Sequence, residues 1–254
     1  MSLLRPVEIG TAEAASLLGR TSPLVKLAIA FSWLLGLATT LDPRPGLFLG
    51  VAAVLAIPLL GAVPSQRIVR FFGPLALAAA GIGLANLLWA APNIDPAATE
   101  LLRLGPLRIT EPAVSAAAGL ITRLLAIAAV GAAFSLTTSA TRLADALVQQ
   151  ARLSARFAYG ALAAYEAVPG LAADFATIRD ARRLRGLPAW YPRVLVTLLI
   201  RAIRHGDQLA LAMDARGFGA GPRSTYRPIR WGWPDAAVGI VGFALVIVAV
   251  LGTR

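Results

Sequence analysis

Two short segments place an arginine directly before a glycine where a helix is expected to end. They are Ala181–Gly186, which reads Ala-Arg-Arg-Leu-Arg-Gly, and Ala212–Gly217, which reads Ala-Met-Asp-Ala-Arg-Gly. A guanidinium can pair with a carboxylate through two parallel hydrogen bonds, and a glycine lets a second backbone approach closely. Glycine and arginine are also common at ordinary helix ends. The pattern therefore indicates either two helix caps or two sites for acidic groups of a partner. The candidate residues are Ala181, Arg182, Arg185, Gly186, Ala215, Arg216 and Gly217.

Catalytic chemistry has few residues to draw on. The chain has no Cys and one His, His205. This excludes thiolate and multi-histidine metal sites and every Cys- or His-based catalytic dyad. The acids Asp95, Glu100 and Glu111 lack metal-ligand spacing. There is no G-x-x-x-x-G-K-[ST] phosphate loop, because the glycine-rich segment 217–221 lacks the lysine. We predict no catalytic residue, no metal site and no cofactor bound by this chain.

Arg123 is the one charged residue deep inside a long apolar stretch. A charge at that depth costs several kcal/mol unless it is paired or hydrated, so a function is the first hypothesis. No acid inside an apolar stretch is available for a proton relay. A structural role is therefore favoured over a role as substrate ligand.

The elements that must position these residues follow from composition. Of 254 residues, 57% are hydrophobic and 15% charged, against about 25% charged in soluble domains. The mean hydropathy is +0.71. These values predict an integral membrane protein. Five stretches are long and apolar enough for spans, which need roughly 20 residues. They are Leu24–Leu41, Gly46–Val63, Phe72–Ala91, Ala113–Leu136 and Ala236–Gly252.

A basic block separates the fourth stretch from the fifth. Ser139–Arg230 holds 14 of the 24 basic residues and 6 acids, and it reads as helical. We expect three helices, Thr141–Ala167, Leu171–Arg185 and Ala189–Arg216, with breaks at Pro169–Gly170 and at 186–188. The third is amphipathic. Its apolar stripe is Leu195, Leu199, Ala202, Leu209 and Met213, and its polar arc is Arg201, Arg204, Asp207, Gln208 and Asp214.

Charge sets the expected orientation. All basic clusters fall on one side if the N-terminus is cytoplasmic, and the C-terminus is then outside. The net charge of +11 fits loops that face anionic lipid. Nucleic-acid binding is not expected, since no soluble domain remains to carry it. The expected fold is an all-α integral membrane protein with about five transmembrane helices and a cytoplasmic module of long amphipathic helices. Its parts would be 1–138, 139–230 and 231–254.

Four segments resemble the transmembrane T component of energy-coupling-factor transporters, a branch of the ATP-binding-cassette importers. Arg20–Leu27 precedes the first apolar stretch and Ser135–Ser139 closes the fourth. The other two are Ala181–Gly186 and Ala212–Phe218, the most specific of the four. The resemblance runs from about Arg20 to Phe218. The first Arg-Gly motif departs from the family pattern, because Leu184 stands where the family usually has Ala.

The resemblance implies a set of partners. In this family two such motifs end the coupling helices and insert into grooves of two cytoplasmic ATPase subunits. Carried over, the inserting residues would be Arg185 and Arg216, although a neighbouring arginine could replace Arg185. The partners would be two ABC-type ATPases that bind ATP and Mg²⁺, and a membrane S component that captures substrate. Arg123 would hold helices together or meet that S component.

The function expected from the resemblance is a non-catalytic coupling subunit. ATP-driven motion of the ATPases would pass through it to the S component, for uptake of a vitamin, vitamin precursor or metal ion across a bacterial inner membrane. Two alternatives are a stand-alone secondary transporter and a membrane-embedded enzyme. The first would need inverted repeats or intramembrane ionisable pairs, and the second would need clustered acids, His or Cys at one bilayer face.

Overall fold

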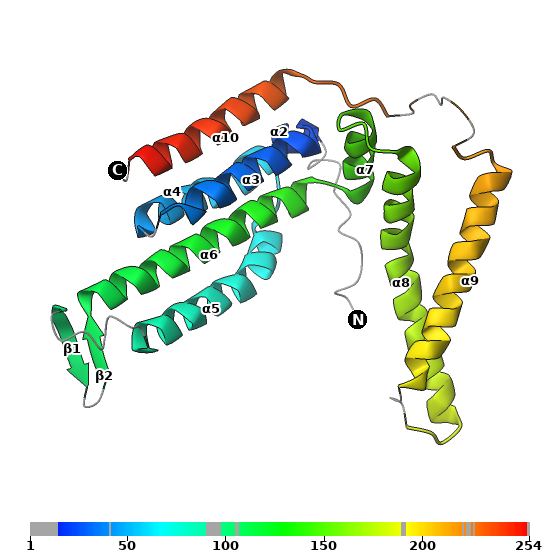
Figure 1. Ribbon diagram of the computed structural model, residues 1–254, viewed down its shortest axis with the longest axis horizontal. Helices are drawn as coiled ribbons and strands as arrows, with labels where there is room; N and C mark the ends of the chain where they lie inside the picture. Colours follow the sequence, from blue (N-terminus) through cyan, green and yellow to red (C-terminus); the bar gives the residue numbers. More distant parts are fainter. Residues whose placement is uncertain are drawn as a thin grey trace. The chain divides into compact units, whose positions relative to one another are not determined.

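The computed structural model of the chain describes residues 15–40, 42–89, 98–104, 107–188, 192–219, 221, 225 and 227–252. Figure 1 shows that this part of the chain is almost entirely helical. Contacts between residues divide it into two compact units. One comprises the described residues of Ile9–Ser139 and Arg230–Arg254, and we call it the apolar unit. The other comprises those of Ala140–Ile229, and we call it the basic unit.

The apolar unit contains a bundle of hydrophobic helices. Four are long and apolar enough to cross a membrane: α4 (Pro43–Gly61), α5 (Ser65–Trp89), α6 (Glu111–Thr137) and α10 (Trp233–Leu251). The unit also contains α2 (Leu17–Arg20) and the apolar α3 (Pro23–Ala38). Each of the five predicted stretches overlaps one of these helices, and the chain is an all-α membrane protein. Pro58 and Pro74 lie inside α4 and α5, which membrane helices tolerate.

The prediction for the first stretch was too long. Helix α3 has 16 residues, or about 24 Å, against roughly 30 Å of hydrocarbon. It begins where the Ser22 side chain accepts a hydrogen bond from the Leu24 N–H, with Pro23 at its first position. It ends at Ala38, where the Thr39 hydroxyl donates to the Gly36 carbonyl. The predicted ends Leu41 and Ala91 lie outside the described residues.

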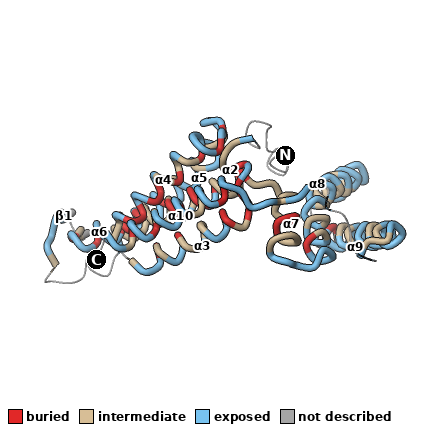
Figure 2. The backbone as a smooth tube through the Cα atoms, turned by 90° about the horizontal axis from the view of Figure 1, so that it is seen from above, coloured by how far each residue is buried: buried red, intermediate tan, exposed pale blue. Residues whose placement is uncertain are grey.

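Small residues let the helices of the apolar unit pack closely. A Cβ added to Gly50 of α4 would lie 3.4 Å from the Ala126 Cα of α6. A Cβ added to Gly36 of α3 would lie 2.5 Å from a Val246 methyl group of α10. Such contacts favour association where lipid offers no hydrophobic driving force between helices. The buried residues of Figure 2 lie where these helices face one another. The main core cluster is Trp33, Leu37, Leu49, Ala53, Ala126, Ala129, Val130, Val246 and Ala249.

Buried polar groups join three helix termini of the apolar unit. The Asp235 carboxylate near the start of α10 accepts hydrogen bonds from the Ser22 N–H at 2.5 Å and the Gly232 N–H at 2.8 Å. The Lys26 ammonium group of α3 donates to the carbonyl and hydroxyl of Thr137, the last residue of α6, at 2.9 and 3.1 Å. These bonds connect the starts of α3 and α10 with the end of α6.

A β-hairpin precedes α6, between the third and fourth predicted spans. Strands β1 (Glu100–Leu104) and β2 (Leu107–Thr110) pair antiparallel, and Glu100 forms an ion pair with Arg108. Two strands this short give only a weak alternation of apolar and polar residues, so the pattern was missed.

The basic unit contains α7 (Ala140–Gln149), α8 (Ala155–Leu184) and α9 (Arg193–Ala215). The predicted break at Pro169–Gly170 is wrong, because α8 continues through Pro169. The break falls instead before Ser154, where Arg152 has a φ of 55° and the Ser154 side chain caps α8 by accepting from the Phe157 N–H. One proline removes one backbone hydrogen bond from a 30-residue helix, and the rest of the helix continues around it.

We predict that Asp235→Ala lowers the free energy of unfolding by about 1–3 kcal/mol, because it removes the acceptor of the buried Ser22 N–H. Thermal unfolding of the purified protein in detergent measures the effect. The matched control is Asp42→Ala. Asp42 also starts a helix, but it accepts from the Arg44 N–H at an exposed site, where water can replace the lost acceptor. Equal melting temperatures for the two variants would contradict this prediction.

Candidate partner-binding site

The end of α8 presents the first arginine–glycine pair. Arg185 is the C-cap residue with φ −89° and ψ 8°, and Gly186 follows with φ 68°. The Gly186 N–H donates to the Arg183 carbonyl, and the Leu187 N–H donates to the Arg182 carbonyl, both at 3.0 Å. This is a Schellman motif, which requires a left-handed residue after the cap. Glycine adopts that conformation without steric cost.

The end of α9 repeats the same geometry. Arg216 is the C-cap residue with φ −88° and ψ 8°, and Gly217 follows with φ 66°. The Gly217 N–H donates to the Asp214 carbonyl and the Phe218 N–H to the Met213 carbonyl, both at 2.9 Å. The two ends therefore place an arginine and a left-handed glycine in the same local arrangement. We call 181–187 and 212–218 the first and second tips.

Both tips expose the residues that a partner could contact. Arg185 and Arg216 are exposed, as are Ala181 and Ala215. Leu184, which stands in the first tip where Ala215 stands in the second, is 90% exposed. Its side chain is larger than alanine, so the first tip presents more apolar surface beside its guanidinium group. Such an arrangement can bind a carboxylate next to an apolar pocket.

The candidate arginines of the first tip differ in their contacts. The Arg182 Nε donates to the Pro188 carbonyl at 3.1 Å, so this half-buried side chain holds the residues that follow the helix. Arg185 lies at the C-cap in the position that Arg216 has in the second tip. The structure therefore makes Arg185 the equivalent of Arg216, while Arg182 shapes the tip from within.

Helices α8 and α9 form an antiparallel pair, as Figure 1 shows. Arg201 of α9 forms an ion pair with Asp174 of α8 at 3.1 Å. Closer to the start of α8, the Arg156 Nη2 donates to the Gly219 carbonyl at 3.5 Å. The second tip thus lies beside the start of α8, and the first tip lies at its end. The 30 residues of α8 separate them by about 45 Å.

The second tip is supported by contacts with α7 and α8. The Tyr159 ring packs edge-on against Phe218, with centroids 6.4 Å apart, and the Tyr159 hydroxyl donates to Asp145 Oδ1 of α7 at 2.7 Å. Burial, followed by the hydrogen bond and charge of Asp145, raises the pKa of Tyr159 to about 12. The hydroxyl therefore keeps its proton at neutral pH and remains a donor. We did not predict this support, because Tyr159 and Phe218 are distant in sequence.

A polar cavity lies midway between the tips, between α8 and α9. It has a volume of about 490 Å³ and is lined by Glu166, Asp174, Arg201, Arg204, His205 and Gln208, together with the apolar Ala167, Gly170 and Leu171. His205 is exposed, as are Arg204 and Gln208. Within the described residues, no three His, Cys, Asp or Glu side chains gather as a metal site would require.

The apolar stripe predicted for α9 differs in burial along its length. Ala202, Leu209 and Met213 are half-buried, while Leu195 and Leu199 are 51% and 59% exposed. The predicted stripe is therefore only partly covered within this unit. The predicted start of this helix at Ala189 lies outside the described residues, and the helix begins at Arg193.

Arg123 lies in α6 of the apolar unit. Its Nη2 donates to the Thr40 carbonyl in the segment between α3 and α4. A Cβ added to Gly46 of α4 would lie 2.9 Å from the Arg123 backbone nitrogen, so α4 and α6 are in close contact at this level. The guanidinium group thus bonds across the bundle to a backbone carbonyl, a contact that accounts for its presence within an apolar helix.

Comparison with known proteins gives a consistent group of relatives. The CbiQ family model, described as "Cobalt transport protein", matches residues 14–226. The energy-coupling factor transporter transmembrane protein EcfT of Bacillus selenitireducens is 28% identical, over 94% of this chain and 93% of that protein. EcfT of Listeria innocua is 29% identical over 55% of this chain and 60% of that protein.

A longer relative carries a different name. A putative ABC transporter ATP-binding protein of Bifidobacterium longum is 26% identical, over 89% of this chain and 30% of that protein. The chain thus matches less than two thirds of the length of this relative and of the Listeria protein.

We predict that Gly186→Ala lowers the free energy of unfolding by about 1 kcal/mol, since alanine is strained at a φ of 68°. Gly186→Asn should cost less, because asparagine tolerates this conformation. The matched control is Gly206→Ala inside α9. An added Cβ meets nothing within 4 Å at either glycine, but Gly206 has no positive φ. The control should be neutral or stabilising by up to about 1 kcal/mol in the same thermal unfolding assay. Destabilisation by the control alone would contradict the assignment.

Proposed function

This chain belongs to the CbiQ family of transporter membrane proteins, and we propose that it is the non-catalytic coupling subunit of an energy-coupling-factor importer. Two ABC-type ATPase subunits bind the tips from the cytoplasm, and a membrane S component binds the substrate. ATP and Mg²⁺ are held by the ATPases. The substrate class is a vitamin, a vitamin precursor or a metal ion.

The observation that carries this proposal is the pair of matching tips. Each one places an exposed arginine at a C-cap before a left-handed glycine, and α8 separates them by about 45 Å. Two equivalent tips this far apart favour two equivalent partner subunits over one, because a single binding groove cannot reach both tips. A pair of ATPase subunits meets this requirement. The names of the EcfT relatives and of the ATP-binding relative support the same class of partner.

The contact at each tip is a charge-assisted hydrogen bond. Arg185 and Arg216 donate to carboxylates in the grooves of the ATPases, and Gly186 and Gly217 let the groove backbone come close. Arg182 keeps its bond to the Pro188 carbonyl and positions the first tip. Leu184 fills an apolar pocket beside the first carboxylate, where the second tip has only Ala215. The two grooves therefore differ in size next to the arginine.

The S component requires an apolar surface. The exposed side chains of α9 include Leu195, Leu199 and Ile203, each more than half exposed. They follow one another at i and i+4, which places them on one face of the helix. We assign the S component to this face of α9. The family implies a hydrophobic membrane partner, and an exposed apolar face is typical of a surface that binds such a partner. Arg123 keeps a structural role through its bond to the Thr40 carbonyl.

The orientation follows from charge. The basic unit lies in the cytoplasm because it carries most of the basic residues. The N-terminus lies on the same side because α3 crosses the membrane together with α4, α5 and α6, with local thinning of the bilayer around its 16 residues. The hairpin β1–β2 is then on the outer face of a bacterial inner membrane, since it lies between the spans α5 and α6.

We predict that replacing both Arg185 and Arg216 with alanine abolishes ATPase retention and substrate uptake. Truncating one partner of a buried charge pair costs about 2–5 kcal/mol, which weakens each contact by about 30-fold or more. Arg216→Ala should be the more severe single change. Pull-down of the ATPases on the purified membrane subunit and uptake in cells provide the measurements.

The matched control for this experiment is Arg183→Ala. Arg183 is exposed in the same turn as Arg185 but does not occupy the C-cap. This variant should retain ATPase binding and uptake, and all variants should express and insert. Normal retention and uptake by the double variant would mean that the arginines are ordinary helix ends.

We predict opposite labelling of two single cysteines, which the cysteine-free chain permits without background. Leu101→Cys, at an exposed position of β1, should react with an impermeant thiol reagent in intact cells. Ala173→Cys, at an exposed position of α8, should react only after permeabilisation. The reverse pattern would invert the topology. Labelling of both cysteines in intact cells would mean that the basic unit does not lie in the cytoplasm.

A further inference from the structure

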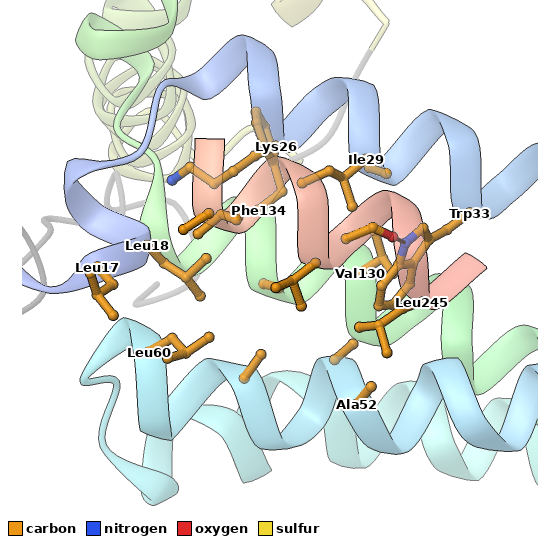
Figure 3. A pocket seen from close by; sticks show the side chains of 18 of the residues that line it. Leu17, Leu18, Lys26, Ile29, Trp33, Ala52, Leu60, Val130, Phe134 and Leu245 are labelled. Atoms are coloured by element: carbon orange, nitrogen blue, oxygen red, sulfur yellow. Dashed lines mark hydrogen bonds between the residues drawn. The ribbon is translucent and has the colours of Figure 1, made fainter. Parts of the chain in front are cut away.

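An elongated apolar cavity lies inside the apolar unit, between α3, α4, α6 and α10. It has a volume of about 280 Å³ and opens to the surface of the unit. Figure 3 shows it extending from Leu17, Leu18 and Lys26 at one end to Trp33 and Leu245 at the other. Lys26 and Trp33 are seven residues apart on α3, so the cavity follows that helix for about 10 Å.

The walls of the cavity exclude water as its occupant. Carbon atoms provide nearly all of the lining, from side chains such as Ala52, Val130, Phe134 and Leu245. A buried water needs two to four polar partners, and apolar cavities of this kind stay dry. An empty cavity of this size is also unfavourable, because its lining loses dispersion contacts on one side. A hydrocarbon group satisfies both conditions.

The surroundings of the cavity indicate where the hydrocarbon comes from. Helices α4, α6 and α10 are long and apolar enough to span a membrane. Two lining residues at the surface, Val241 and Leu60, are 56% and 37% exposed and apolar. In a bilayer such an opening faces lipid tails, which are present at high local concentration and need no specific partner.

The two ends of the cavity are chemically different. One end is closed by Trp33, which is 5% exposed and whose Nε1 donates to the Gly242 carbonyl at 2.8 Å. The other end holds Lys26, the one charged residue of the lining, together with the exposed Trp233. A cation and a tryptophan are typical of the membrane interface. A phospholipid therefore fits with its head towards Lys26 and one tail towards Trp33.

We propose that this cavity binds one acyl chain of a phospholipid from the leaflet at the Lys26 end of the bundle. The chain packs between α3, α4, α6 and α10 and fills the space that these helices leave at their centre. The head group lies at this end, where Lys26 and Trp233 mark the interface, and the Lys26 ammonium group stays bonded to Thr137. This site is separate from the tips and does not depend on the partners assigned to them.

Tryptophan fluorescence tests this proposal in the full chain reconstituted in nanodiscs. A variant that keeps Trp33 and replaces the other four tryptophans with phenylalanine reports only on the closed end of the cavity. Lipids with brominated tails quench a tryptophan on contact. Because Trp33 is buried, tails that surround the bundle can reach it only through the cavity. We expect its emission to fall in brominated lipid, as does that of a variant keeping only the 77% exposed Trp89.

Two substitutions on α4 make the test specific. Ala52→Phe, added to the Trp33-only variant, fills the cavity beside Trp33 and should abolish its quenching. Leu59→Phe is the matched control, because Leu59 is 77% exposed and lies outside the lining. It should leave the quenching unchanged. Native mass spectrometry should find a retained phospholipid on the unmodified chain and lose it with Ala52→Phe.

Three results would overturn the proposal. An unquenched Trp33 beside a quenched Trp89 would mean that the cavity is empty or belongs to a partner's helix. Quenching that persists with Ala52→Phe would mean that the bromine reaches Trp33 by another route. A phospholipid retained equally by Ala52→Phe and Leu59→Phe would place the bound lipid elsewhere.

Discussion

Hydrocarbon cannot form hydrogen bonds, and the apolar unit is organised around that constraint. Every backbone N–H and C=O inside the bilayer must find its partner within the protein, so the spans are helical. The polar groups that remain gather where helices begin and end. Asp235 binds the Ser22 and Gly232 N–H groups, and Lys26 binds Thr137. Within the bundle, Arg123 and Trp33 each donate to a backbone carbonyl of a neighbouring segment.

The basic unit differs from the apolar unit in how its residues are covered. Few residues of α8 and α9 are buried, as Figure 2 shows by the pale colour of these helices. Their Schellman ends and the Ser154 cap satisfy the terminal backbone groups locally. Ion pairing between Arg201 and Asp174 and packing between Tyr159 and Phe218 join the two helices at separate points. A pair held by so few contacts has most of its surface left for partners.

The sequence predicted what depends on local composition. Apolar stretches located the helices of the apolar unit, and the Arg-Gly pairs located the ends of α8 and α9. The predictions failed where the structure depends on contacts between distant residues or on weak local patterns. Pro169 predicts a break, but α8 continues because the loss of one hydrogen bond is a small cost in a helix of this length. The hairpin before α6 was missed because its strands are short. The hydrogen bond from Arg182 to the Pro188 carbonyl and the one from Tyr159 to Asp145 depend on the folded structure. The spacing of residues in the sequence does not predict them.

The length of α8 gives the pair of tips a mechanical property. Each tip lies about 22 Å from the polar cavity at the middle of the helix pair. If the pair turns as a rigid body about that middle, both ends move by about 0.4 Å for each degree, in opposite directions. A rotation of about 10° would displace each arginine by about 4 Å, against a rise of about 5.4 Å for one helical turn. The α8–α9 pair can thus act as a two-armed lever. A small rotation of the pair displaces the two tips by several ångströms, equally and in opposite directions.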